Sequence, residues 1–304
     1  MPEKLNLLIP LDFRPESESA LEYAVSIGKN LNARLHLLHI LEEESPLYRI
    51  VISDKQREMI RLGASEKLDE LAEKFLVPEN LSYTRTVMQG KVYDKIIEAS
   101  QKTRSRLIIM GRTDSSDMKK NITGTNTMHI IKEARVPVLT LRKKQAHPGC
   151  SHIILPLDLT KQTIIKASNA IGMAKILQAR ITVVSLLQDN RKSTEIIFIQ
   201  RLDEIRNIFE KLEVPCAVKL VPADDDNFYT RLNRTVTELK GDLVMIMTQQ
   251  ELNVTEYFIG SRAQEIINRS DYPVLSINPR SGEKYGIPDP MSNTFINPLQ
   301  ILDR

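Results

Sequence analysis

The stretch from Arg106 to Thr127 carries the residues whose types and spacing most clearly suggest chemistry. It reads RLIIMGRTDSSDMKKNITGTNT: a short apolar run ends at Gly111, and a second glycine, Gly124, precedes a helical pattern. A strand that ends at a glycine and a helix that begins at one leave backbone N–H groups facing a shared hollow, where the helix dipole favours an anion. The stretch predicts a phosphate-binding loop. The alternative is that both glycines serve only as turn residues.

The chain contains two copies of one unit. The segment LNLLIPLDFRPES near the N-terminus matches SHIILPLDLTKQT further on, so that Pro10 and Asp12 correspond to Pro156 and Asp158. Later landmarks recur in the same order: ARLHLLHI with ARITVVSL, RLIIMG with DLVMIM, Gly124-Thr125 with Gly260-Ser261, and Pro137-Val138-Leu139 with Pro273-Val274-Leu275. This order indicates an internal duplication.

Each copy alternates strand and helix patterns. In the first, helical periods separate apolar runs of strand length at Leu5 to Leu11, Arg34 to Leu41, Ser82 to Met88, Leu107 to Met110 and Val138 to Leu141. Nearly continuous apolar strands in such an order predict an α/β fold with a parallel five-stranded sheet covered by helices on both faces. Ligands on such sheets sit beyond the carboxyl ends of the strands, where strand order reverses. Asp12 and Gly111 fall at that end.

The organisation expected for the chain is two such domains, a linker and a tail. Domain 1 covers residues 1–143, a charged linker 144–151, domain 2 152–279, and an extended arm 280–304. The tail from Pro279 contains four prolines and ends in apolar residues that could dock on a groove, and a partly disordered tail is the alternative.

Composition excludes several classes of protein. Of 304 residues, 41% are hydrophobic and 27% charged, and the net charge is only +3, which favours a globular protein over a nucleic-acid binder. The apolar runs are too short for a membrane span, and the N-terminus lacks a signal-peptide pattern, so we expect a cytoplasmic protein without a membrane partner. Two cysteines provide no disulfide framework. The chain has no GxxxxGK[ST] sequence, which argues against a P-loop NTPase.

The combination of these features resembles the universal stress protein family in its tandem two-domain form. The resemblance covers roughly residues 4–142 and 151–278. Nucleotide-binding members of that family carry G-x2-G-x9-G-[ST] after the fourth strand and an Asp at the end of the first. Here Gly111, Asp114, Gly124 and Thr125 keep that spacing, with Asp114 in place of the middle glycine.

The resemblance implies an adenine nucleotide site in domain 1. Asp12 would accept hydrogen bonds from the ribose, or act only as a cap or turn residue, whereas Ile40 and Met110 would line the base. Gly111 would let the backbone approach the phosphates, and Gly124, Thr125 and Asn126 would offer donors at the helix start. The family also pairs its domains through their last strands, which here are Val138 to Leu141 and Val274 to Ile277.

Asp114 is the departure from the pattern that bears most on binding. Two negative charges about 4 Å apart near a protein surface repel by on the order of 4 kcal/mol. Arg112, Lys119 and Lys120 could offset that charge, and Asp114 could also share Mg²⁺ with the phosphates. In domain 2 the sequence comparison puts Thr248 and Glu251 at the first two glycine positions, so no cofactor is expected there.

Other candidate residues favour structural roles. His147, Cys150 and His152 offer three metal ligands without an apparent fourth, so no metal site is predicted. His36 and His39 lie on one strand at odd spacing, which indicates opposite faces and packing roles. No Ser, His and acid combination supports a hydrolase triad, so no catalytic residue is assigned.

Three functions remain open. The first is a stress-response binding and signalling protein in which domain 1 senses ATP or another adenine nucleotide. The second is a nucleotide-independent scaffold that binds an unknown protein partner, and the third is a slow ATPase, for which no general base is placed. The two domains would form an intrachain pseudo-dimer, and a homodimer of whole chains is a further possibility.

Overall fold

The computed structural model describes residues 4–42, 53–112, 125–142, 149–159, 163–248 and 259–278. Within domain 1 the elements alternate as expected: β1 (Asn6–Pro10), α1 (Pro15–Leu31), β2 (Arg34–Leu41), α3 (Asp54–Phe75), β3 (Ser82–Gln89), α4 (Val92–Lys102), β4 (Leu107–Gly111), α5 (Thr125–Glu133) and β5 (Val138–Leu141). The predicted strands of this domain, and the helices between them, are confirmed. The expected C-terminal arm and most of the expected linker lie outside the described residues.

Domain 2 repeats the same order. Its elements are β6 (His152–Pro156), α6 (Thr163–Leu177), β7 (Arg180–Leu186), α7 (Lys192–Lys211), β8 (Cys216–Val221), α8 (Phe228–Glu238), β9 (Leu243–Met247), α9 (Ser261–Arg269) and β10 (Val274–Ile277). The repeated order agrees with the duplication inferred from the sequence.

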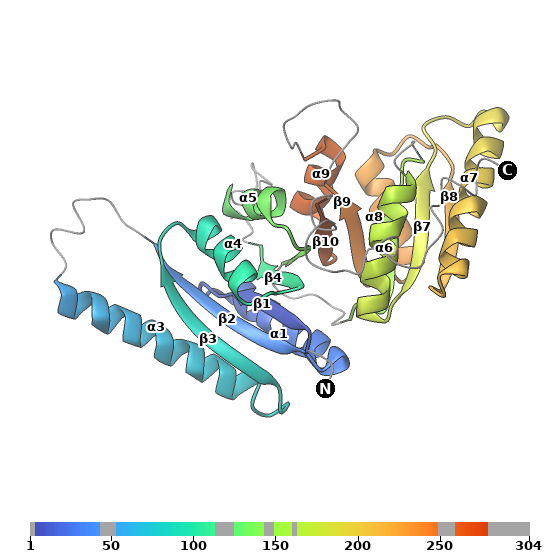
Figure 1. Ribbon diagram of the computed structural model, residues 1–304. Helices are drawn as coiled ribbons and strands as arrows, with labels where there is room; N and C mark the ends of the chain where they lie inside the picture. The colour runs from blue at the N-terminus through green and yellow to red at the C-terminus, as the bar shows by residue number, and fades with distance from the viewer. Residues whose placement is uncertain are drawn as a thin grey trace.

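All ten of these strands form one sheet in the order β3-β2-β1-β4-β5-β10-β9-β6-β7-β8, which Figure 1 shows running through both domains. Neighbouring strands within each domain are parallel, and β5 and β10 pair antiparallel at the centre, with Leu139 opposite Leu275. The prediction that the domains join through their last strands is therefore confirmed. In each half the strand order reverses between two central strands, β1 and β4 in domain 1 and β6 and β9 in domain 2.

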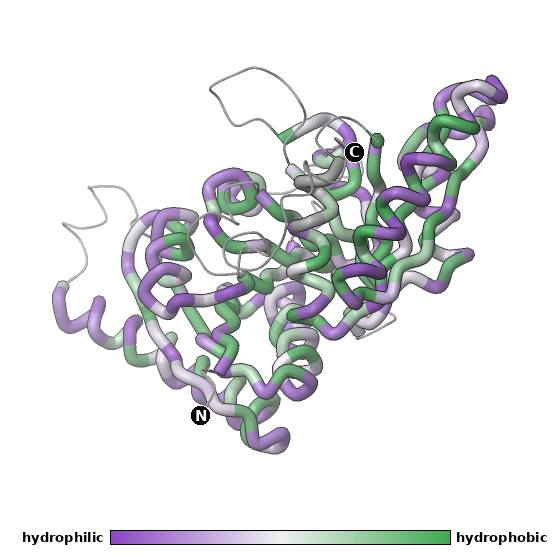
Figure 2. Tube along the Cα trace, turned by 45° about the vertical axis from the view of Figure 1, so that its right-hand side comes forward, coloured by the Kyte–Doolittle hydropathy of each residue, from purple (hydrophilic) through white to green (hydrophobic). Residues whose placement is uncertain are grey.

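Helices cover both faces of the sheet. One apolar core lies beneath α1, α3, α6 and α7 and continues from one domain into the other, whereas the second lies beneath α4, α5, α8 and α9. Figure 2 shows the hydrophobic residues concentrated along the strands and the hydrophilic ones along the outer turns of the helices. The central strands read as continuous apolar runs because they are buried on both faces.

The two domains also exchange hydrogen bonds at helix ends. Arg142, just after β5, donates from Nη2 to the carbonyl of Asn268 at the end of α9 (2.8 Å). Asn278, just after β10, donates to the carbonyl of Lys132 in the last turn of α5. Since the last carbonyls of a helix lack partners within it, each domain satisfies a helix terminus of the other. The contact fixes the arrangement of the two domains.

His36 and His152 occupy related sites on the buried sheet. His36 on β2 lies 2.6 Å from Thr84 Oγ1 and 3.1 Å from Asn6 Oδ1, and His152 on β6 lies 2.8 Å from Thr182 Oγ1. His39, by contrast, lies 2.7 Å from the carbonyl of Leu11 and stacks on Phe13. Packing roles for His36 and His39 are confirmed.

These two buried imidazoles predict a loss of stability in mild acid. Burial lowers the pKa of His36 and of His152 below the ordinary value, with smaller contributions from Arg34 and Arg180. As the pH falls, these two histidines therefore bind protons in the unfolded chain before they do so in the folded protein. The neutral imidazoles thus contribute their full stability above about pH 6.5, and this stability declines as the pH falls through that value. Thermal unfolding from pH 7.5 to 5.5 measures the decline. His36→Asn should flatten it, and an unchanged slope would contradict this assignment.

Candidate functional site

Asp12 lies in a tight turn just beyond the end of β1, at the point where strand order reverses. Its carboxylate accepts a hydrogen bond from the backbone N–H of Arg14 (3.1 Å), and its side chain is 56% exposed. The next residue, Phe13, has a φ of 63°, a left-handed conformation that costs a non-glycine residue roughly 1–2 kcal/mol. The turn role considered for Asp12 is thus observed, and its carboxylate stays accessible to a ligand.

Domain 2 builds the same turn from different residues. Leu159, which follows Asp158, also has a left-handed φ of 52°. In both domains the carbonyl of the residue before the aspartate takes part in a hydrogen bond. His39 Nδ1 bonds the carbonyl of Leu11, and the hydroxyl of Ser185 donates to the carbonyl of Leu157. A strained backbone that is kept in two copies with different side chains indicates a geometry specified by the fold.

Ile40 and Met110, the residues expected to line a base, lie on one face of the sheet. Met110 is buried in the core beneath α4 and α5, and Ile40 packs against the same core. Asn126 is half-buried in the first turn of α5. Asp12, Ile40 and Met110 therefore lie at the carboxyl ends of the neighbouring strands β1, β2 and β4, and Asn126 lies at the start of the helix that follows β4. Asp114 and Gly124 lie outside the described residues, as does the side chain of Thr125.

Gly111 makes a contact that the sequence did not predict. A Cβ added there would lie 2.4 Å from the backbone carbonyl carbon and oxygen of Glu16 and 2.7 Å from the amide nitrogen of Ser17. These atoms belong to the first turn of α1, which therefore packs directly on the end of β4. The glycine is needed for this close approach whether or not a phosphate binds.

Arg112 corrects a second expectation. The sequence suggested that its charge could offset Asp114 beside the phosphates, but its side chain is buried, at 2% exposure, and donates from Nη2 to the carbonyl of Ser270 in domain 2 (2.7 Å). Together with Arg142 it meets the C-terminal end of α9, where cations are favoured by the helix dipole. Lys119 and Lys120 lie outside the described residues.

The correspondence of the two loops is also corrected by one residue. Arg112 N–H donates to the carbonyl of Leu141, and Thr248 N–H donates to the carbonyl of Ile277. Thr248 is therefore the counterpart of Arg112, and Met247 that of Gly111, because the same backbone bond follows the strand end in each domain. The assignment of Thr248 to the first glycine position was wrong, and the matching shift moves the second position from Glu251 to Gln250.

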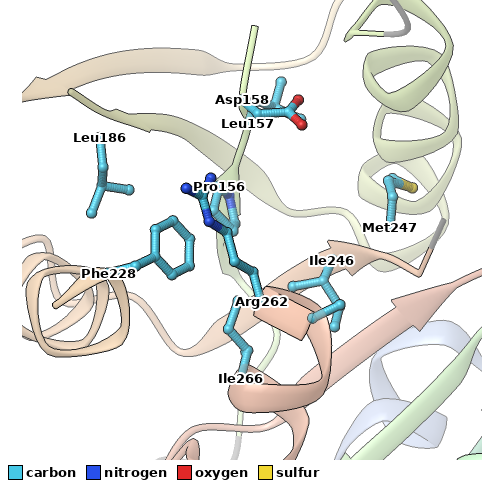
Figure 3. Close-up of a pocket in the computed structure, with 10 residues that line it drawn as sticks. Pro156, Leu157, Asp158, Leu186, Phe228, Ile246, Met247, Arg262 and Ile266 are labelled. Carbon is cyan, nitrogen blue, oxygen red and sulfur yellow. The ribbon is translucent and has the colours of Figure 1, made fainter. Parts of the chain in front are cut away.

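A pocket of 80 Å³ lies in domain 2 at the edge that corresponds to the site predicted in domain 1. Figure 3 shows Pro156 and Asp158 at the end of β6, with Leu186, Ile246 and Ile266 around the apolar part. Arg262, in the first turn of α9, enters the pocket, and its guanidinium lies 4.9 Å from the centre of the Phe228 ring. The sequence reasoning missed both of these residues.

One signal could have revealed Arg262. A cation in the first turn of a helix is unfavourable with respect to the helix dipole. An arginine directly after Gly260-Ser261 therefore has to gain its stability from another contact, which here is the Phe228 ring.

The described residues give no support to a metal site in the linker. They contain no group of three or more potential ligands of the His, Cys, Asp or Glu types. Burial raises the pKa of the Cys150 thiol to about 12, so the thiolate that a metal would need is disfavoured. His147 lies outside the described residues.

Among the described helices, none is long and apolar enough to cross a membrane.

The strand order defines a class: two tandem doubly wound α/β domains, each with a reversal of strand order between two central strands. Residues 5–142 match the family model described as "Universal stress protein family". The first domain is therefore similar to this family, and the second domain repeats the fold of the first.

Curated relatives and solved structures show the same similarity. Universal stress protein MJ0531 of Methanocaldococcus jannaschii is 25% identical over 144 residues, covering 45% of this chain and 81% of the relative. Universal stress protein A homolog 1 of Coxiella burnetii is also 25% identical, covering 46% of this chain and 97% of the relative. A universal stress protein from Archaeoglobus fulgidus has a TM-score of 0.68 at 17% identity, covering 90% of this chain and 96% of that structure. At that identity the likeness shows the fold, and it extends over both domains.

Proposed function

We propose that the protein is a binding and signalling member of the universal stress protein family, with an adenine nucleotide site in domain 1. One observation carries the proposal: Asp12 and the strand ends bearing Ile40 and Met110 lie together at the reversal between β1 and β4. An exposed carboxylate at this edge suits ribose hydroxyls, and an apolar strand face suits a base. Gly124, Thr125 and Asn126 at the start of α5 would hold the phosphates, with Mg²⁺ bridging them to Asp114.

A nucleotide-independent scaffold is the second candidate function. The burial of Arg112 against domain 2 favours it, because this charge is used in the domain interface instead of beside a phosphate. In that case the sheet and its helices would present a surface to a protein partner.

Calorimetric titration of the full chain with ATP and Mg²⁺ separates the two functions. We expect a dissociation constant on the order of micromolar. Asp12→Ala should weaken binding about tenfold, since it removes hydrogen bonds to a charged acceptor. Asp158→Ala is the matched control, because it changes the equivalent turn of domain 2 and should leave the titration unchanged.

A companion variant tests the role of Asp114. Asp114→Gly should strengthen ATP binding if repulsion between Asp114 and the phosphates limits the affinity. Release of ADP during the titration would distinguish hydrolysis from binding alone. If neither heat nor a thermal shift appears up to about millimolar nucleotide, the scaffold function holds instead.

A further inference from the structure

The pocket of domain 2 has an apolar floor and one charged wall. Leu186, Ile246 and Ile266 supply hydrocarbon from β7, β9 and α9, and Arg262 supplies the positive charge (Figure 3). An apolar floor beside a single cation selects a ligand that carries hydrocarbon at one end and a negative charge at the other.

Arg262 is positioned for such a ligand. Its guanidinium lies against the face of Phe228, and within the described part of the chain it forms no ion pair. A guanidinium held over an aromatic ring can direct the N–H groups of its edge to a ligand, and this edge matches a carboxylate in a bidentate pair. The aromatic contact therefore orients the arginine while leaving its donors available.

The volume of the pocket suits a small ligand. Its volume is 80 Å³. A water molecule takes up about 30 Å³, and a cavity of about 150 Å³ accommodates benzene, so this pocket suits a chain of about four heavy atoms.

Asp158 adds a criterion of charge. It lies at the pocket and has an interaction of its own, and Figure 3 shows its carboxylate apart from the guanidinium of Arg262. Its negative charge repels a polyvalent phosphate more strongly than a monovalent carboxylate. We propose that the domain 2 pocket binds a short-chain monocarboxylate, with the alkyl group on the apolar floor and the carboxylate on Arg262.

Butyrate is the probe for this proposal, with butylamine and inorganic phosphate as controls of charge and shape. The full-length protein is labelled at its isoleucine methyl groups, since Ile246 lines this pocket and Ile40 lies at the nucleotide edge of domain 1. Butyrate should shift the Ile246 signal saturably and leave Ile40 unchanged, whereas butylamine and phosphate should shift neither. This readout tests the carboxylate site of domain 2 separately from the nucleotide site of domain 1, so that one hypothesis can be wrong while the other holds.

Variants assign the effect to Arg262. Arg262→Gln should weaken butyrate binding about tenfold or more. Arg262→Lys should have an affinity between those of the unchanged protein and Arg262→Gln, because lysine keeps the positive charge but lacks the forked donors of the guanidinium. Arg206→Gln, on the exposed surface of α7, is the control and should bind as the unchanged protein does. Leu186→Phe, which fills the pocket and keeps Arg262, should also reduce binding.

Three results would overturn the proposal. One is the absence of a saturable Ile246 shift up to about 20 mM butyrate. Another is equal binding of butyrate and butylamine, or of butyrate and phosphate. The third is unchanged binding by a folded Arg262→Gln protein.

Discussion

Replacing Gly111 by alanine should destabilise domain 1 by about 3 kcal/mol, at the upper end of the usual cost of overpacking. The added methyl group would lie 2.4 Å from the carbonyl carbon and oxygen of Glu16, well inside van der Waals contact. The atoms that it meets are backbone, which cannot move aside by changing a rotamer. Relief requires α1 to shift away from β4, and this shift would loosen the core between them. Chemical denaturation of the full chain measures the loss.

Gly63 provides a matched control for this prediction. It lies in the interior of α3, and a Cβ there would meet nothing within 4 Å. Gly63→Ala should therefore stabilise the protein by about 0.5–1 kcal/mol, the gain expected from helix propensity alone. If Gly111→Ala left stability unchanged and weakened only nucleotide binding, the close packing of α1 would not explain this glycine.

The fold could be predicted from the sequence because its determinants are local or periodic. Strands buried on both faces read as continuous apolar runs, as in Leu107–Gly111, and the duplication shows each signal twice. The pairing of β5 with β10 was predicted from the family resemblance instead, and its antiparallel direction comes from the structure. Nothing in VLTL or VLSI by itself specifies which strand will pair with it.

The candidate site was only partly predictable, because its residues act through contacts made far along the chain. The Asp12 turn was recognised from its place after a strand, but the partner of Arg112 is Ser270, which no local pattern indicates. The glycine motif predicts a phosphate-binding role for Gly111, whereas the contact of Gly111 with α1 depends on tertiary packing and cannot be predicted from the motif. Phe228 and Arg262 lie on different helices, so their stacking was equally inaccessible to spacing arguments.

Helix α9 connects these observations. Its first turn places Arg262 in the domain 2 pocket, and its C-terminal end receives hydrogen bonds from Arg112 and Arg142 of domain 1. Arg112 directly follows Gly111 at the end of β4. The segment that leads into the predicted phosphate loop is thus tied to the helix that forms the second pocket.

Arg112→Met should cost about 2–3 kcal/mol of stability, because it removes a charged hydrogen bond and leaves the carbonyl of Ser270 without this donor in a buried interface. Methionine keeps much of the side-chain volume, so the change tests the guanidinium and not a cavity. Hydrogen exchange should accelerate selectively at the C-terminal end of α9. Denaturant unfolding of the full chain gives the accompanying free energy.

Arg206→Met on α7 is the control, since its ion pairs with Asp203 and Glu210 are exposed and should contribute no more than about 0.5 kcal/mol. The two possible roles of Arg112 predict opposite results. If Arg112 served a bound phosphate, Arg112→Met would weaken ATP binding while stability and α9 exchange stayed unchanged. Because the side chain is 2% exposed and bonded to the other domain, we expect the reverse: a loss of stability at the interface, with direct phosphate contacts unaffected.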